Sequence, residues 1–252
     1  MPGTPTLTPL PRSRFHPGVT IRALLFDCGG TLDGPGRHWL DRFVDLYRDA
    51  GLDVSSECIK AAFYRADEAA YAEPRLAAVG LRELMEFHVG VQFACLGTGE
   101  AALQRQLVDR FVADSEAALA ASRRVLDRLA ARYRLGVVSN FYGNVASILA
   151  AADIAPLLAV IVDSTAAGVS KPDARIFARA LSVLGVRAGE TLHVGDSYER
   201  DVRGAHAAGL RTAWLVHTAD AMAASDCVAD LRVRSLEELA DHLERRAGFP
   251  RP

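Results

Sequence analysis

Four short polar blocks in this chain combine residue types that suit phosphate and metal chemistry. Asp27 ends a short apolar run and precedes two glycines, and Ser139-Asn140, Lys171 and Asp196 follow much later in the chain. Carboxylate oxygens are ligands that Mg²⁺ prefers, and a lysine supplies a positive charge for phosphate oxygens. The four blocks therefore indicate a site for Mg²⁺ and phosphate, provided that the fold brings them together.

The elements around these blocks predict a fold that does so. Apolar runs typical of strands alternate with segments of helical spacing, and this alternation predicts a parallel sheet with helices on both faces, a doubly wound Rossmann-like α/β fold. In such a sheet the carboxyl ends of the strands face one crevice. The predicted strands are residues 21–26, 134–140, 158–162, 191–194 and 212–216, and the helices between them are 144–152, 173–184 and 199–208.

A block of helices separates the first predicted strand from the second. Apolar residues recur at helical spacing over residues 37–113, with no strand signal, which predicts an all-α unit inserted into the chain. A further helix at about 115–133 leads back to the sheet. The resulting division gives a Pro-rich flexible tail (1–20), an α/β core (21–34 and 115–247), the helical insert (35–114) and a short C-terminal tail (248–252).

Composition narrows the class of function. The chain has 252 residues and a net charge of −2, which indicates no nucleic-acid partner, and it has no apolar run long enough to cross a bilayer. Its four cysteines are far apart, without the spacing of a metal site or a disulfide framework, so a cytoplasmic location is expected. Of its 29 basic residues only Lys60 and Lys171 are lysines. A lysine within a polar block of this chain is therefore less expected to be there by chance.

These blocks together resemble the haloacid dehalogenase superfamily of hydrolases. The matching segments are 27–32 (DCGGTL), 137–140 (VVSN), 171–173 (KPD) and 195–201 (GDSYERD), in the family's order. The helical insert lies where the family often carries a helical cap. The resemblance covers about residues 20–245 and implies a hydrolase of small phosphate esters that uses Mg²⁺; it does not indicate an oligomeric state.

The resemblance also implies a role for each block. Asp27 would be the nucleophile that becomes an aspartyl-phosphate, and Lys171 would neutralise Asp27 and the phosphate. Ser139 and the backbone amide of Asn140 would bind the transferring phosphoryl group. The implied Mg²⁺ ligands are Asp27, the backbone carbonyl of Gly29, and Asp196, with Asp201 binding either Lys171 or a metal-bound water.

One position departs from the family's pattern. Its phosphatases usually carry an aspartate two residues after the nucleophile, which protonates the leaving group, and here that residue is Gly29. Asp33 is a weak candidate to replace it. Three further interpretations stay open: a haloacid dehalogenase, a phosphonate hydrolase with Lys60 as its Schiff-base lysine, or a phosphate-binding member without catalysis. The dehalogenase is less favoured because those enzymes generally lack a counterpart of Asp196.

Structural interpretations are favoured for the polar or reactive residues near these blocks. His193 lies within an apolar strand and is expected to pack in the core, and Cys28 is expected to be a packed rather than a reactive thiol. Arg37, His38 and Trp39 follow the first block and could face substrate, although a solvated helix start is the favoured interpretation.

Overall fold

The computed structural model describes residues 20–218 and 227–246. Its strands are β1 (Ala23–Phe26), β2 (Arg134–Ser139), β3 (Val160–Asp163), β4 (Thr191–Gly195), β5 (Arg211–Leu215) and β6 (Leu231–Val233). Its α-helices are α1 (Trp39–Asp49), α2 (Ser56–Tyr71), α3 (Leu81–Leu96), α4 (Ala101–Ala130), α5 (Val145–Ala151), α6 (Ser164–Ala167), α7 (Ala174–Leu184), α8 (Gly204–Ala207) and α10 (Leu236–Arg246). Shorter helical turns are η1 (Pro74–Ala78), η2 (Ala155–Leu157), η3 (Ala188–Glu190) and the π-helix η4 (Tyr198–Arg203).

Within the described residues the strands form one parallel sheet of six, in the order β3-β2-β1-β4-β5-β6. β1 lies at its centre, and the chain crosses to β2 and β3 on one side before it returns to β4 on the other. This order confirms the predicted doubly wound α/β fold. The three-residue edge strand β6 was not predicted, because so short a run lacks a readable period.

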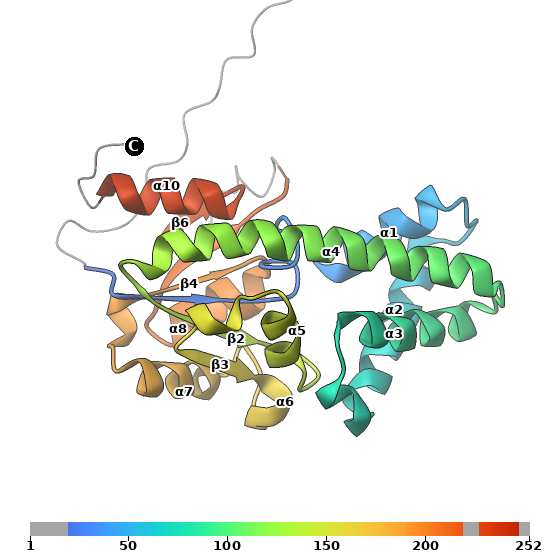
Figure 1. Cartoon of the computed structure of the whole chain (residues 1–252), viewed down its shortest axis with the longest axis horizontal. Helices are drawn as coiled ribbons and strands as arrows, with labels where there is room; N and C mark the ends of the chain where they lie inside the picture. The colour runs from blue at the N-terminus through green and yellow to red at the C-terminus, as the bar shows by residue number, and fades with distance from the viewer. Residues whose placement is uncertain (1–19, 219–226, 247–252) are drawn as a thin grey trace, which may run out of the picture.

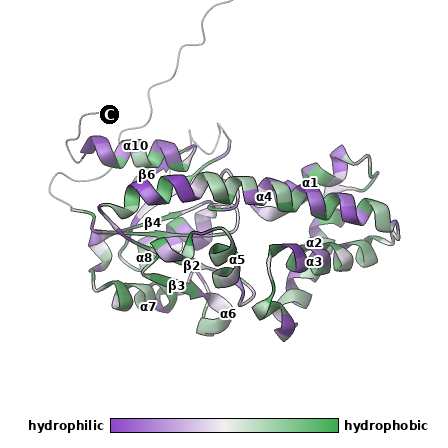
Figure 2. Cartoon of the chain, viewed as in Figure 1, coloured by the Kyte–Doolittle hydropathy of each residue, from purple (hydrophilic) through white to green (hydrophobic). Residues whose placement is uncertain are grey.

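The two faces of β1 pack against different layers, as alternation along a strand requires. Leu24 and Phe26 belong to the cluster that includes α4, α5 and α10, whereas Ala23 and Leu25 pack with α7 and α8. Figure 1 shows α4 and α10 above the sheet and α7 below it. In Figure 2 both hydrophobic and hydrophilic residues appear along α10, as expected of a helix that buries only one face.

Helices α1, α2 and α3 lie beside the sheet, whereas α4 runs from them back over the sheet (Figure 1). Helix α2 packs closely against α3, and α3 against α4. The two helices predicted at 103–111 and 115–133 are one 30-residue helix, α4, whose C-terminal part also contacts β2 and α10. The prediction of two helices was therefore wrong: residues 113–117, interpreted as a join, contain neither glycine nor proline, so nothing in them stops a helix.

The proposed boundary between residues 114 and 115 falls inside α4, so a single helix belongs to both parts of the chain.

The tail predictions concern residues that lie outside the described part, apart from Thr20. The single helix predicted at 199–208 is instead the π-helix η4 followed by the short α8. Among the described residues, none of the helices is both long and apolar enough to span a membrane.

Candidate active site

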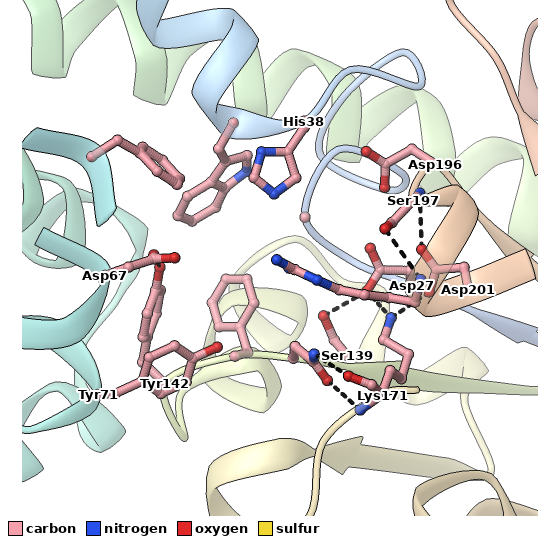
Figure 3. A pocket seen from close by; sticks show the side chains of 16 residues that line it. Asp27, His38, Asp67, Tyr71, Ser139, Tyr142, Lys171, Asp196, Ser197 and Asp201 are labelled. Carbon is pink, nitrogen blue, oxygen red and sulfur yellow. Dashed lines mark hydrogen bonds and ion pairs between the residues drawn. The ribbon is translucent and has the colours of Figure 1, made fainter. Parts of the chain in front are cut away.

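A cavity opens where the carboxyl ends of β1, β2 and β4 face the helices α1 and α2 (Figure 3). One part of its wall, called here the sheet end, is formed by the predicted polar blocks. The opposite part, called here the helical end, is largely aromatic. The sheet end comprises Asp27, Ser139, Lys171, Asp196 and Asp201, and the helical end comprises His38, Trp39, Phe63, Asp67, Tyr71 and Tyr142.

Asp27 follows directly after β1, and its backbone N–H is bonded to Val194 of β4 at 2.9 Å. Its carboxylate oxygen Oδ1 accepts hydrogen bonds from Ser139 Oγ at 2.8 Å and from Lys171 Nζ at 2.6 Å. No described residue donates a hydrogen bond to the other oxygen, Oδ2. One oxygen of Asp27 is thus fixed, while the second is available to a ligand in the cavity.

Lys171 is held in place through both its side chain and its backbone. Asn140 brackets the backbone: its Nδ2 donates to Lys171 O at 3.0 Å, and its Oδ1 accepts from Lys171 N at 2.8 Å. The ammonium lies between Asp27 and Asp201, at 2.6 Å from an oxygen of each. Burial opposes the charge, but Asp201 and Asp27 outweigh it and raise the pKa of Lys171, so the side chain is a permanent cation.

Asp201, on η4, uses both of its oxygens to hold neighbouring groups. Oδ1 accepts from Lys171 Nζ and from His193 Nε2 at 3.0 Å, and Oδ2 accepts from the backbone N–H of Ser197 at 3.0 Å. Burial opposes ionisation of Asp201, yet the charge of Lys171 and the His193 contact lower its pKa. Of the two roles that the sequence left open, these contacts support the Lys171 partner; a part in metal binding stays a prediction.

The carboxylates of the sheet end form a group that a cation would fit. Carboxylate oxygens of Asp27, Asp196 and Asp201 all lie within 4.8 Å of one another. Burial, together with the charges of Asp27 and Asp201, raises the pKa of Asp196 well above its usual range. The buried carboxylates of Asp27 and Asp201 and the half-buried one of Asp196 face a single lysine, so the donor set is hard and carries an excess of negative charge. Both properties suit Mg²⁺.

Gly29 and Gly30 differ in whether their backbone conformation and surroundings require a glycine. Gly30 has a positive φ of 83°, and a Cβ there would lie 2.6 Å from Asp196 Oδ2, so a side chain would enter the carboxylate cluster. Gly29 has no positive φ, and the nearest atom to its Cβ would be Trp39 Nε1 at 3.6 Å. Gly29 lines the cavity. The acid/base group is therefore missing because glycine has no side chain, although the surrounding space would accept one.

Asp33 does not take up the role of the missing acid. Its Oδ1 accepts from the backbone N–H of Gly30 at 2.6 Å, and its Oδ2 accepts from Trp39 Nε1 at 2.7 Å. Arg42 lies 3.6 Å away, and Asp33 is not part of the cavity wall. Burial raises the pKa of Asp33. Its contacts make it an organiser of the loop after β1 and of the Trp39 ring.

The structural interpretations made from the sequence have mixed outcomes. Cys28 is packed, and burial followed by the Asp33 charge raises its pKa, as expected of an inert thiol. His193 is buried against Phe177 as predicted, but it also contacts Asp201, which the apolar setting of β4 did not reveal. The solvated helix start was wrong for His38 and Trp39: both line the cavity, because the Asp33 bond turns Trp39 inward.

Sequence reasoning missed most of the helical end. Phe63, Asp67 and Tyr71 are four residues apart on α2 and therefore share one face of that helix. A carboxylate between two aromatic residues at this spacing is the signal that could have found them. Tyr142, just beyond the second polar block, and Arg200, within the fourth, also line the cavity.

Comparisons with known proteins agree with this geometry. The chain is 40% identical to haloacid dehalogenase-like hydrolase domain-containing protein 3 of Bos taurus over 79 residues, 31% of this chain and 32% of that protein. It is 38% identical to phosphoserine phosphatase of Thermus thermophilus over 94 residues, 36% and 38% of the two chains. The chain thus spans about a third of the length of these two relatives.

A solved structure shares the fold over nearly the whole chain. The HAD hydrolase YfnB of Bacillus subtilis, determined with bound magnesium, superposes with a TM-score of 0.55 at 20% identity and covers 89% of this chain and 99% of its own. The family model of haloacid dehalogenase-like hydrolases matches residues 21–209, which include all four polar blocks and the helices between them. The chain therefore belongs to the haloacid dehalogenase-like hydrolases.

Proposed function

We propose that the protein is a Mg²⁺-dependent phosphatase of small phosphate esters that works through an aspartyl-phosphate on Asp27. The observation that carries this proposal is the asymmetry of the Asp27 carboxylate. Ser139 and Lys171 hold Oδ1, while Oδ2 faces the cavity without a partner among the described residues. An anchored carboxylate with one available oxygen suits a nucleophile, because phosphoryl transfer needs mainly positioning and charge stabilisation.

The residues of the chain then have defined tasks. Asp27 Oδ2 forms a bond to phosphorus as the bond from phosphorus to the leaving oxygen breaks, and water later cleaves the acyl phosphate to return the carboxylate and release phosphate. Lys171 offsets negative charge beside Asp27, and Ser139 is placed to donate to a phosphoryl oxygen. Mg²⁺, held by Asp27, Asp196 and the Gly29 carbonyl, would add positive charge next to the phosphoryl oxygens.

Two relatives support this choice of reaction. The matched region of the Thermus thermophilus protein belongs to a phosphoserine phosphatase, and YfnB was solved with magnesium. A cytoplasmic location is part of the same proposal, and it is supported by the four cysteines, all of which are free thiols. The partner expected is a small-molecule phosphate ester.

We further propose that residues 35–114 act as a cap over the sheet end. Support comes from the cavity wall, to which α1 and α2 contribute on one side and the ends of β1, β2 and β4 on the other. The Tyr142 hydroxyl, on the loop after β2, donates to Asp67 on α2 and so ties the two sides together. Closure of such a wall would exclude water from the reacting phosphate.

The test is phosphate release from an aryl phosphate and from a panel of metabolite phosphates, by wild-type protein and by Asp27→Asn. Wild-type protein should release phosphate, and Asp27→Asn should lose turnover while its circular dichroism spectrum stays the same. Turnover close to wild type in folded Asp27→Asn protein would show that Asp27 is not the nucleophile. Phosphate binding by the wild type without any turnover would favour a non-catalytic member.

A dehalogenase and a phosphonate hydrolase would each be detected by a different assay. Chloride release from a 2-chloro acid in EDTA would indicate a dehalogenase, which the carboxylate cluster around Asp196 does not favour. A phosphonate hydrolase would be trapped by borohydride with phosphonoacetaldehyde. Its Schiff-base lysine would have to be Lys60, whose side chain is exposed on α2 and takes no part in the cavity wall.

A further inference from the structure

The helical end of the cavity holds a carboxylate, Asp67, that a buried chain of hydrogen bonds keeps in place. The Tyr47 hydroxyl donates to Gln92 Oε1 at 3.1 Å, and Gln92 Nε2 lies 2.8 Å from His88 Nδ1. His88 Nε2 in turn lies 3.4 Å from Asp67 Oδ1, and the same oxygen accepts a hydrogen bond from the Tyr142 hydroxyl. Tyr47, Gln92 and His88 are fully buried, so the chain is sealed from water.

The order of donors in this chain fixes the proton on His88. Because Tyr47 donates to the amide oxygen of Gln92, the amide NH₂ faces His88 Nδ1, and that nitrogen must accept. The ring proton then lies on Nε2 and is donated to Asp67 Oδ1. Two donors therefore converge on one oxygen of Asp67, and no described residue bonds to its Oδ2. The side chain is 24% exposed and points into the cavity (Figure 3).

Arg200 supplies the opposite charge to the same cavity. It comes from η4 on the sheet side and is an exposed residue at the rim of the cavity, and its guanidinium forms no ion pair or hydrogen bond with another described residue. Asp67 and Arg200 are not joined to each other by an ion pair. Besides the carboxylates of the sheet end, the cavity thus holds one anionic and one cationic group whose capacity for bonding is not fully used within the described chain.

Both charges shift the pKa values of two ring side chains that line the cavity, His38 and Tyr142. Burial lowers the pKa of His38 and Arg200 lowers it further, whereas Asp67 acts in the opposite direction. Burial raises the pKa of Tyr142, Asp67 raises it further, and Arg200 opposes the rise. Both charges are therefore within electrostatic reach of the same two rings. Asp67 and Arg200 also line the same cavity, so a ligand that fills it lies in the field of both charges.

We propose that the substrate's leaving group is a zwitterion, an amino acid phosphorylated on its side-chain hydroxyl, with Asp67 binding its ammonium and Arg200 its carboxylate. The inference rests on the proposed phosphatase function and names its substrate class. An α-amino acid carries both charges on one carbon, so a single small group satisfies Asp67 Oδ2 and the guanidinium together. Charge-assisted hydrogen bonds at such a site are the strong ones, and the surrounding rings favour the ammonium.

Simpler leaving groups match the cavity less well. A neutral polyol bound between them would displace water from both charges without supplying a counterion to either, which is costly. An amine without a carboxylate would meet Asp67 but would also face the uncompensated charge of Arg200. A carboxylate without an amine would have the converse problem with Asp67. Only a group with both charges is complementary to both side chains.

The experiment uses four phosphate esters that share a primary alcohol and differ in charge. They are O-phospho-L-serine, with both charges; phosphoethanolamine, with the ammonium; 3-phosphooxypropanoate, with the carboxylate; and propyl phosphate, with neither. The kcat/KM of each is measured with wild-type protein, Asp67→Asn, Arg200→Gln and the control Glu68→Gln. Glu68 neighbours Asp67 on α2, but its side chain is exposed and lies outside the cavity wall.

The wild-type protein should prefer phosphoserine, with each charge contact contributing about 10- to 100-fold in kcat/KM. Asp67→Asn should lose that factor only for the two ammonium esters, and Arg200→Gln only for the two carboxylate esters. Glu68→Gln should keep the wild-type ratios. Since each variant is compared with wild type on the same ester, differences in leaving-group reactivity cancel.

Several results would overturn the inference. Equal kcat/KM for the four esters in wild-type protein would do so without any variant, and so would a larger value for glycerol phosphate. An Arg200→Gln loss that is equal for all four esters would place Arg200 at the phosphoryl group instead. Absence of turnover with every ester and with an aryl phosphate would contradict the proposed function. In that case calorimetric binding of the four esters to Asp27→Asn protein still measures the preference separately.

Discussion

The two ends of the cavity are built on different physical principles. At the sheet end Asp27, Ser139 and Asp196 stand at or just beyond the carboxyl ends of strands, and the register of the parallel sheet sets their separations. Lys171 and Asp201 come from a loop and from η4 and are tied to Asp27 by the Lys171 ion pairs. At the helical end the polar groups are held by side chains of three packed helices, through a relay that starts at Tyr47 and ends at Asp67. The backbone places the groups proposed for the reaction, and side-chain packing places the groups proposed to contact the rest of the substrate.

The two ends of the cavity also differ in how their charges balance. At the sheet end, three carboxylates and one lysine lie close together, so the group carries an excess of negative charge. One divalent cation would bring it close to neutrality. Asp67 at the helical end and Arg200 on η4 carry opposite charges but are not paired with each other. The first arrangement calls for a metal ion, and the second for a ligand with both signs of charge. Perturbing each end should therefore give effects of different kind and size.

The largest effect should come from removing the metal. EDTA should abolish turnover, by at least about 10³-fold, because the developing charge on the phosphoryl oxygens loses its main counterion. Mg²⁺ should restore the activity and raise the melting temperature, since a ligand that binds only the folded state stabilises it. Asp196→Asn should lose both responses. Full activity in EDTA would contradict the metal assignment.

The Asp196→Asn protein offers a second readout without activity. In the metal-free protein Asp196 repels Asp27 and Asp201, so the neutral amide should leave the melting temperature equal or higher. A marked fall in melting temperature without metal would mean that Asp196 stabilises the fold directly. The comparison with wild type, with and without Mg²⁺, separates the two roles.

The next largest effect should follow the loss of the buried cation. Lys171→Met leaves Asp27 and Asp201 as buried carboxylates without their partner, and this should lower the free energy of unfolding by about 3–5 kcal/mol. Lys60→Met is the matched control, because Lys60 is the only other lysine and is exposed. It should change that free energy by less than about 0.5 kcal/mol. Urea unfolding measures both, and similar values for the two variants would contradict the burial argument.

A smaller effect is expected from the relay at the helical end. Gln92→Met keeps the volume of the side chain but removes the partners of the Tyr47 hydroxyl and of His88 Nδ1, which should cost about 1–3 kcal/mol of unfolding free energy. Asp67 should also lose orientation, so the preference for phosphoserine over propyl phosphate should fall. A stable variant with an unchanged preference would show that Asp67 does not depend on this relay.

How far the sequence could predict the site follows from the same contrast. Asp27, Ser139 and Asp196 are readable because each ends an apolar run of strand length, and parallel strands bring their carboxyl ends to one edge. Lys171 was readable as one of two lysines in an Arg-rich chain. The Asn140 side chain was not, because its contact is with the Lys171 backbone across a loop whose path no local pattern specifies.

The helical end was less readable for a physical reason. The helical spacing of α2 predicts which residues share a face, but not whether that face meets the protein core or a cavity. Tyr142 and Asp67 meet only because the loop after β2 approaches α2, a contact between segments 75 residues apart. The join predicted within α4 failed similarly, since propensity alone did not show that one helix continues through residues 113–117.

The smallest effect concerns Gly29, which lines the cavity. Gly29→Asp would supply the acid that the family's phosphatases usually have, and the structure leaves room for it: the nearest atoms to a new Cβ are Trp39 Nε1 at 3.6 Å and Phe141 at 3.8 Å. Alkyl phosphates need a proton on the departing oxygen, whereas aryl phosphates leave readily as anions. The ratio of alkyl to aryl kcat/KM should therefore rise, by about 10-fold, the low end of what acid catalysis gives.

Gly30→Ala provides the contrast for this substitution, because its Cβ would strike Asp196 and its φ is positive. It should lower activity on alkyl and aryl phosphates alike, through the carboxylate cluster, and should leave their ratio unchanged. For folded Gly29→Asp protein with chemistry as the rate-limiting step, an unchanged or lower ratio would mean that the proton already comes from elsewhere. His38 would be the next residue to replace, because it lines the cavity and its Nδ1 already accepts from Leu40 N at 3.2 Å, which leaves Nε2 to carry a proton toward the leaving group.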